Sequence, residues 1–282
     1  MDPSERVTLA LGTAVESARP TGAAITGERW RVRLDHGRDV FVKTRDDAPD
    51  GFFAAEAAGL DWLGAVDGGP PVPPVLAYGT DLLVLPWLVE ERPAGATVER
   101  LGRELGAMHA AGSPVFGAAQ DGWIGAAELE NGPLAGWPEF YAQRRVLPYV
   151  RQLRDGGQLG SGEAAVFDRL AARLPELAGP AEPPARIHGD LWTGNVLWSG
   201  DRGWLVDPAA HGGHRETDLA MLTLFAEGWV PRVLAAYDES TPLADGWRER
   251  QRLHQIHPLL VHAVLFGGGY LAAALTAASD YV

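Results

Sequence analysis

The sequence predicts an α+β protein with a small N-terminal lobe, built on an antiparallel sheet and one main helix, and a larger, mostly helical C-terminal lobe. Residues 29–34 alternate between arginine and apolar side chains, and a DHGR turn followed by DVFVK completes a β-hairpin. From residue 97 the apolar residues recur instead at helical spacing, as in TVERLGRELGAMHAAG. We therefore expect an N-terminal lobe of residues 1–88 and a C-terminal lobe of residues 89–282.

Further elements follow from the same patterns. Two short strands joined by a Gly-Thr-Asp turn are expected in VLAYGTDLLVLPWLV, just before the lobe boundary. In the C-terminal lobe we expect helices near residues 137–155, 161–178, 215–227 and 244–278, with Pro148 interrupting the first.

The composition is that of an acidic globular protein. Of 282 residues, 46% are apolar, and 37 acidic side chains outnumber 24 basic ones, which gives a formal net charge of −13. This charge argues against nucleic acid and anionic membranes as partners and favours a cationic ligand. The absence of cysteine excludes disulfides, thiol nucleophiles and cysteine-based zinc sites.

One uncharged stretch, residues 258–278, has the length of a membrane span. It contains His262 and three consecutive glycines and has no basic belt on its C-terminal side, so we interpret it as buried helix of a soluble core. The N-terminus has no signal-peptide pattern, and we expect a cytoplasmic protein.

The basic residues comprise 23 arginines and a single lysine, Lys43, which closes the predicted hairpin. Lysine is a slim point charge, whereas arginine is a wide planar fork, so a retained lysine suggests a phosphate pocket that needs a compact ammonium. Chance survival of one lysine is the alternative. The preceding PTGAAITGERW could fold over a ligand, but it is not a Walker A loop.

Glu56 lies on the apolar stripe of the helix predicted in PDGFFAAEAAGLDWLGAV, between Phe53 and Leu60. No basic residue stands three or four positions away, so a buried carboxylate here needs a partner from elsewhere in the fold. Lys43 is the candidate. The alternative is a glutamate at the edge of the stripe with its carboxylate in water.

The stretch IHGDLWTGNVLW places Asp190 and Asn195 in a short polar loop between apolar runs, and Asp207 follows in WLVDPAAHGG. Two strands joined by a turn at residues 200–203 would bring Asn195 beside Asp207. Phosphoryl transfer from ATP needs a carboxylate to orient the acceptor hydroxyl and oxygen ligands for Mg²⁺. These three residues meet that requirement.

Together these features resemble the protein-kinase-like phosphotransferases of small molecules. More narrowly, the sequence resembles the fructosamine kinase (ketosamine-3-kinase) family in four segments: HGDLWTGN, DPAAHGGHRETDLAMLTLF, IGAAELENGPLAGWPEFYAQRRVLP and HPLLVHAVLFGGGY. The HGDxxxxN pattern alone is shared with aminoglycoside and choline kinases. The flanking segments therefore specify the branch.

This resemblance implies a two-lobed kinase-like fold and the use of ATP and Mg²⁺. Lys43 would hold the α and β phosphates and pair with Glu56, Asp190 would be the catalytic base, and Asn195 and Asp207 would bind Mg²⁺.

Two further sets of residues follow from the resemblance. Adenine would be held by the backbone of Pro86, Trp87 and Leu88, although Pro86 has no N–H to donate. Trp192 would stack against a sugar-amine. The acceptor would lie between residues 112–145, Trp192 and the C-terminal helix.

The remaining polar residues have structural interpretations. We expect His188 and Asp218 to brace the loop that carries the base. The spacing of His211 and His214, or of the three histidines between 254 and 262, is compatible with a metal site. Without a nearby carboxylate or cysteine set, we do not expect zinc there.

The predicted function is phosphorylation of the 3-hydroxyl of ketosamines, in deglycation. The substrates would be fructosamine, ribulosamine or erythrulosamine adducts of small amines or protein lysines, and the protein a monomer or weak dimer. A kinase of another amine or alcohol, such as an aminoglycoside or a choline-like compound, is the alternative. A catalytically dead nucleotide-binding protein is disfavoured because the lysine, the glutamate and the three loop residues are all retained.

Overall fold

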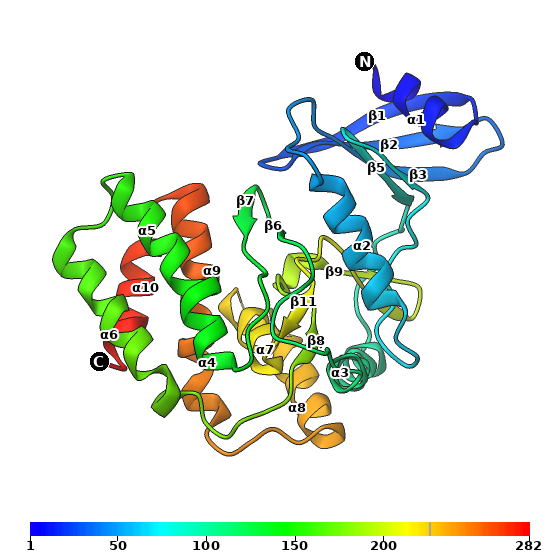
Figure 1. Cartoon of the computed structure of the whole chain (residues 1–282). Coiled ribbons are helices and arrows are strands. Elements are labelled where there is room, and N and C mark those ends of the chain that lie inside the picture. The colour runs from blue at the N-terminus through cyan, green and yellow to red at the C-terminus, as the bar shows by residue number, and fades with distance from the viewer. Residues whose placement is uncertain (226) are drawn as a thin grey trace.

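The computed structural model describes residues 1–225 and 227–282 and has the predicted α+β architecture (Figure 1). A five-stranded antiparallel sheet, in the order β1-β2-β3-β5-β4, forms the N-terminal lobe. Its strands are β1 (Val15–Ala24), β2 (Gly27–Leu34), β3 (Asp39–Thr44), β4 (Ala77–Tyr78) and β5 (Leu82–Pro86). Helices α1 (Pro3–Leu11) and α2 (Phe52–Gly64) pack against opposite faces of this sheet.

Strand alternation explains where the lysine lies. Val40 and Val42 of β3 point toward the core under α1, whereas Phe41 and Lys43 point to the face that α2 covers. Strand β2 pairs with β3 so that Arg29 stands directly opposite Lys43. The two basic side chains therefore approach the same edge of the interlobe region from neighbouring strands.

The C-terminal lobe is mostly helical and is drawn from green to red in Figure 1. Its helices are α3 (Gly95–Ala110), α4 (Trp137–Phe140), a π-helix (Tyr141–Val146), α5 (Leu147–Asp155), α6 (Ser161–Leu177), α7 (Arg215–Leu224), α8 (Val230–Ser240), α9 (Trp247–Phe266) and α10 (Tyr270–Ser279). The sheet ends at Pro86 and the first of these helices begins at Gly95, so the boundary proposed after residue 88 lies in the connecting segment.

Two details differ from the expected helices, and one cannot be compared. The segment 244–278 forms α9 and α10 instead of one helix, because Gly267 and Gly268 adopt left-handed backbone angles between them. Helix α8 was not expected; it is stabilised by packing on α3, where a Cβ at Gly102 would lie 2.3 Å from the Val233 carbonyl oxygen. Residue 226 of the expected helix 215–227 lies outside the described residues.

The irregularity expected at Pro148 takes the form of the π-helix. Pro148 has no N–H, so it cannot donate to the carbonyl oxygen of Arg144 four residues earlier. The guanidinium of Arg145 donates to that oxygen instead, with Nη1 at 3.0 Å. Arg145 is thereby turned into the protein interior, where it is buried.

Short strands connect the helices near the lobe interface. They form three antiparallel pairs: β6 (Gly122–Ile124) with β7 (Ala127–Leu129), β8 (Ala185–Ile187) with β11 (His211–Gly213), and β9 (Val196–Ser199) with β10 (Arg202–Leu205). The β6–β7 hairpin reaches α2 of the other lobe, where the rings of Trp123 and Phe52 lie 5.5 Å apart. In the described parts of the chain, every helix is too short or too polar to span a bilayer.

Candidate active site

The loop after β8 is held by a buried aspartate. Asp218, at the start of α7, accepts hydrogen bonds from the backbone N–H groups of His188 (2.7 Å) and Gly189 (2.9 Å). His109 contacts the same carboxylate at 3.2 Å. Although burial acts to raise its pKa, the hydrogen bond from His109 holds the pKa of Asp218 below its ordinary value. Asp218 is therefore an anion, and its carboxylate fixes the backbone of the loop.

Gly189 is required by the tight course of this loop. Its φ is +82°, and a Cβ at this position would lie 2.2 Å from the carbonyl oxygen of Ala209. On the other side of the loop, His188 Nε2 lies 3.0 Å from the Val206 carbonyl oxygen. His188 is fully buried and ties the loop to the segment that carries Asp207.

Asp190 follows this fixed backbone and reaches the interlobe space. Asn195 donates from Nδ2 to the backbone oxygen of Asp190 (2.8 Å) and to its Oδ2 (3.2 Å). Burial, followed by repulsion from Asp207, raises the pKa of Asp190 to about 7. A carboxyl with such a pKa can accept a proton at neutral pH.

Lys43 lies between two carboxylates. Its Nζ is 2.6 Å from Glu56 Oε1 and 2.8 Å from Asp207 Oδ1, and its side chain is 4% exposed. Although burial acts to lower it, attraction by Asp207 and Glu56 raises the pKa of Lys43. The Lys43 side chain therefore stays a charged ammonium. Glu56 has no basic neighbour on its own helix, and its partner comes from β3.

Asp207 carries two further signs of a functional position. It has a left-handed φ of +56°, uncommon for a residue with a side chain. Its Oδ2 also lies 3.3 Å from Nη2 of Arg29, a residue that the sequence interpretation missed. Arg29 could be found only from the strand register, which places it opposite Lys43.

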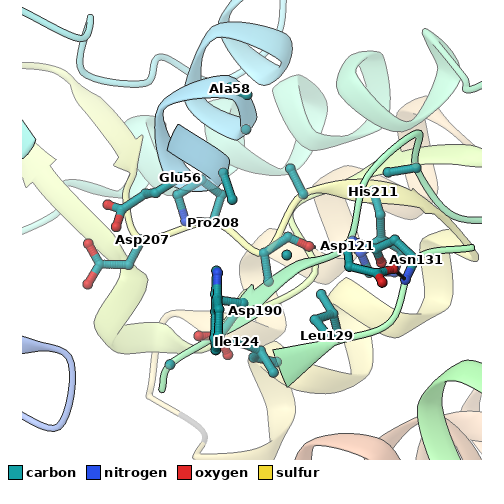
Figure 2. A pocket seen from close by; sticks show the side chains of 18 of the residues that line it. Glu56, Ala58, Asp121, Ile124, Leu129, Asn131, Asp190, Asp207, Pro208 and His211 are labelled. Atoms are coloured by element: carbon teal, nitrogen blue, oxygen red, sulfur yellow. Dashed lines mark hydrogen bonds between the residues drawn. The ribbon is translucent and has the colours of Figure 1, made fainter. Parts of the chain in front are cut away.

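These residues line one cavity of about 940 Å³ between the lobes (Figure 2). Its lining includes every charged or amide residue expected at the phosphates or the metal: Lys43, Glu56, Asp190, Asn195 and Asp207. His188 and Asp218 lie behind the loop instead. In Figure 2, Asp207 and Asp190 occupy one part of the cavity, while Asp121, Asn131 and His211 occupy another.

The residues expected to hold adenine lie apart from this cavity. Pro86, Trp87 and Leu88 are not part of its lining. The N–H of Trp87 donates to the Asp39 carbonyl oxygen (3.3 Å), and the guanidinium of Arg31 lies 4.7 Å from the indole. Their role in adenine binding stays a prediction.

The part of the cavity where the acceptor is expected is lined by residues from the segments 113–125 and 129–133, by Trp192 and by the C-terminal part of α9. Trp192 is 37% exposed and meets the ring of Phe225 edge-to-face at 6.0 Å. His262, whose ring lies 5.4 Å from that of Phe225, extends this aromatic wall. Sequence reasoning located the segment but did not single out Asp121 or Asn131, which meet only in the folded chain.

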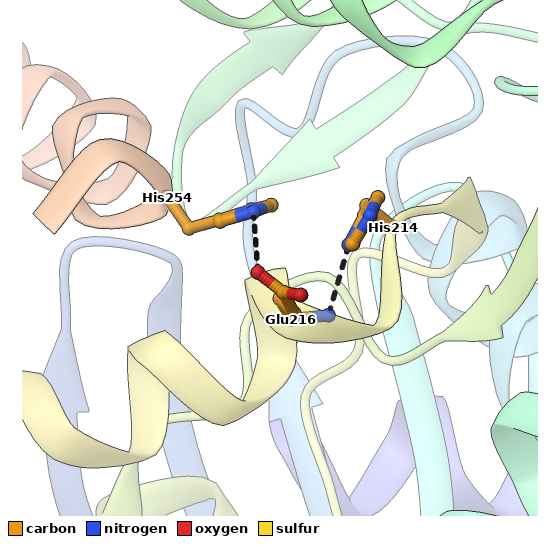
Figure 3. A group of neighbouring side chains, drawn as sticks. All are labelled: His214, Glu216 and His254. Atoms are coloured by element: carbon orange, nitrogen blue, oxygen red, sulfur yellow. Dashed lines mark hydrogen bonds and ion pairs between the residues drawn. The ribbon is translucent and has the colours of Figure 1, made fainter. Parts of the chain in front are cut away.

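Behind the loop, His214, Glu216 and His254 form a buried cluster with the atom types of a metal site (Figure 3). The carboxylate absent from the sequence argument is therefore present. However, Arg250 donates to both oxygens of Glu216, at 2.6 and 2.9 Å, and already neutralises it. The His214 ring also accepts from the N–H of Glu216 at 3.2 Å, capping α7. These contacts account for the cluster as structural support.

Comparison with known proteins gives a consistent result over the whole chain. A sequence profile of the fructosamine kinase family matches residues 4–281. A Thermus thermophilus protein named "Probable ketoamine kinase" is 35% identical over 99% of both chains. The chloroplastic protein-ribulosamine 3-kinase of Arabidopsis thaliana is 29% identical, with 100% of this chain and 88% of that protein covered.

Comparison with solved structures leads to the same family and the same fold. A crystal structure from Thermobifida fusca, of a protein described provisionally as a fructosamine-3-kinase, shares 48% identity at a TM-score of 0.94 and covers 99% of this chain and 98% of that one. An ADP-bound aminoglycoside phosphotransferase has a TM-score of 0.64 at 12% identity, with full coverage of both chains. At that identity the likeness concerns the fold alone, and it confirms the predicted kinase-like architecture.

Proposed function

Because the chain belongs to the fructosamine kinase family, we propose that it transfers the γ-phosphoryl group of ATP to the 3-hydroxyl of a ketosamine, a ketose joined through C1 to an amine. Family membership confirms the predicted class of enzyme, an ATP-dependent kinase of ketosamines. The observation that carries the residue assignment is the convergence of Lys43, Asp190, Asn195 and Asp207 on one cavity.

On the nucleotide side, Lys43 positions the phosphates. Its ammonium is buried and fixed by Glu56, so it presents charge at a defined place without a reorganisation cost. Glu56 acts through Lys43 and orients it.

The donor set fits Mg²⁺. The amide nitrogen of Asn195 is committed to Asp190, and its Oδ1 has no donor among the described residues, so it can serve as a hard oxygen ligand; Asp207 adds carboxylate oxygens. Asn195 and Asp207 would hold the ion, which supplies charge neutralisation for the phosphates when bound. Ion pairs with Lys43 and Arg29 hold the Asp207 carboxylate in position.

Asp190 is the proposed base. It lies on a loop fixed by Asp218 and by the amide of Asn195, and its pKa near 7 suits proton acceptance from a hydroxyl. Its carboxylate orients the acceptor hydroxyl and takes up the proton as the new O–P bond forms.

Trp192 and the net charge of −13 favour a cationic sugar-amine as acceptor. The 3-phosphate formed is prone to β-elimination, which releases the amine, so the proposed role is deglycation of metabolites or protein lysines. We propose ribulosamines and erythrulosamines as better substrates than fructosamines, and a cytoplasmic enzyme that is a monomer or weak dimer.

The test is a phosphorylation assay with ATP, Mg²⁺ and lysine adducts of fructose, ribulose and erythrulose, with the phosphate located by NMR. We expect turnover and phosphate on C3. Turnover of kanamycin without turnover of any ketosamine would instead support the alternative activity, that of an aminoglycoside kinase.

A variant of Trp192 tests the acceptor site within this assay. Trp192→Ala should raise the KM of the sugar-amine by roughly tenfold, the value of one lost aromatic contact, and leave the KM of ATP nearly unchanged. Tyr78→Ala, which removes an exposed aromatic ring outside the cavity, is the matched control.

A further inference from the structure

We propose that Asp121 and Asn131 form a pair that hydrogen-bonds the hydroxyl groups of the acceptor sugar beyond C3. The pair lines the acceptor part of the cavity, and no role follows for it from the phosphate chemistry described above. This inference rests on the proposed function, because it assigns the residues that select among ketosamines.

The orientation of the Asn131 amide is fixed by the protein. Arg145 Nη2 donates to Asn131 Oδ1 at 2.6 Å, and a guanidinium can only donate, so the amide oxygen must face Arg145. The amide nitrogen therefore points the other way, toward Gly122, which also lines the cavity. Asn131 is 3% exposed, and within the described residues its Nδ2 has no hydrogen-bond acceptor.

Arg145 is itself held firmly. Its Nη1 donates to the carbonyl oxygens of Glu130 (2.5 Å) and Arg144 (3.0 Å), and its guanidinium lies 4.5 Å from the centre of the Phe140 ring. The π-helix turns Arg145 inward to make these contacts. The Asn131 amide is therefore held with its nitrogen available for a ligand in the cavity.

Asp121 supplies the complementary acceptor. One carboxylate oxygen, Oδ1, accepts from the backbone N–H of Asn131 at 2.6 Å, which places the two side chains next to each other. Oδ2 has no partner among the described residues, and the side chain is at the exposed rim of the cavity. The pair thus presents one free donor and one free anionic acceptor.

This combination fits hydroxyl groups better than an ammonium. A hydroxyl donates to the carboxylate and accepts from the amide, whereas an ammonium has no lone pair for the amide to use. In Figure 2, Asp190 lies between Asp207 and the Asp121–Asn131 pair. With the 3-hydroxyl at Asp190, the hydroxyls of the distal carbons extend toward the pair.

Two nearly isosteric substitutions test the pair while retaining its structural contacts. Asn131→Asp keeps an oxygen for Arg145 but replaces the cavity-facing donor with an acceptor. Asp121→Asn keeps an oxygen for the Asn131 N–H but removes the charge of the free acceptor. Glu128→Gln is the matched control, because Glu128 is exposed on the same hairpin and does not line the cavity.

The measurement is kcat/KM on a series with one amine and three sugars: erythrulosamine, ribulosamine and fructosamine. The hydroxyls beyond C3 increase in number along this series. We expect each variant to lose about 10- to 100-fold on the longest sugar, as for a hydrogen bond to a charged or buried group, and little on the shortest. The KM of ATP and the melting temperature should stay unchanged.

The outcomes separate this inference from the proposed function. Equal losses on all three sugars, or no loss on any, with a wild-type enzyme that phosphorylates ketosamines would overturn the role of the pair alone. A wild-type enzyme inactive on every ketosamine would overturn the proposed function and this inference with it.

Discussion

Two groups of charged side chains lie near the loop that carries Asp190, and they are built differently: one lines the cavity, and the other is buried. The cavity charge group comprises Arg29, Lys43, Glu56 and Asp207, which contact mainly one another and line the cavity. The bracing group comprises His109, Glu216, Asp218 and Arg250, and lies outside the cavity lining.

The partners of the two groups explain the difference. Asp218 is saturated by two backbone N–H groups and His109, and Glu216 by the fork of Arg250. In the cavity charge group, Asp207 instead contacts the side chains of Lys43 and Arg29, which under the proposed function give way to an incoming phosphate or metal ion. Under the proposed function, ion pairs serve binding in one place and support in the other, and the same substitution should have different consequences in each.

The largest effect is expected at the loop residue between the groups. Asp190→Asn should lower kcat on the order of 10³-fold because the base is lost, while Mg·ATP binding is retained. Asp207→Asn should weaken Mg²⁺-dependent ATP binding. Calorimetric titration of Mg·ATP into both variants separates the roles, and equal loss of binding in the two would contradict the assignment.

Within the cavity charge group, Lys43→Arg should lower kcat/KM for ATP on the order of 10²-fold without lowering the melting temperature. Charge is retained, but the wide guanidinium cannot occupy the place of Nζ between two carboxylates 2.6 and 2.8 Å away. Arg45→Lys, an exchange in the other direction just after β3, should leave the rate unchanged. Near-full activity of Lys43→Arg would refute the argument from the single lysine.

In the bracing group, Asp218→Asn should instead lower the free energy of unfolding, by about 2 kcal/mol, because an amide cannot accept from both backbone N–H groups. Thermal unfolding should show a melting temperature lower by roughly 5 °C. The same substitution at Asp201, whose side chain is 78% exposed, should have little effect. An unchanged melting temperature for Asp218→Asn would remove the distinction between the groups.

At neutral pH the smallest effect is expected at His214, whose ring caps α7 beside the bracing group. Burial lowers the pKa of His214 to about 3, so below its ordinary pKa of 6.5 the unfolded chain binds a proton that the folded chain does not. Stability therefore falls as the pH drops from 6.5 toward 3, by up to about 1.4 kcal/mol per pH unit from this group. His214→Asn keeps a capping oxygen and should flatten this dependence, measured by urea unfolding at several pH values.

A matched control for that measurement is His36→Asn. His36 is exposed in the β2–β3 turn, and its replacement should leave the slope with pH as it is. An identical slope in His214→Asn and the wild type would show that the acid sensitivity arises elsewhere.

The sequence was most informative where chemistry is carried by local spacing. The two lobes, the Lys43 hairpin and the loop with Asp190 follow from periodicity and from residues that have no local partner. Arg29 and Asn131 could not be found in this way, because their meaning depends on strand register and on a π-helix that turns Arg145 inward. Helix α8 was missed because packing against α3, more than its own short pattern, defines it.

The single lysine has a chemical consequence for an enzyme that meets sugars and their adducts. Reducing sugars condense with unprotonated amines, and surface lysines are the usual sites of this reaction. Here the one ε-amine is 4% exposed and held as an ammonium between two carboxylates, so apart from the α-amino group the chain offers no reactive amine to a sugar. A protein proposed to repair glycated amines is thus almost free of the functional group whose damage it would reverse.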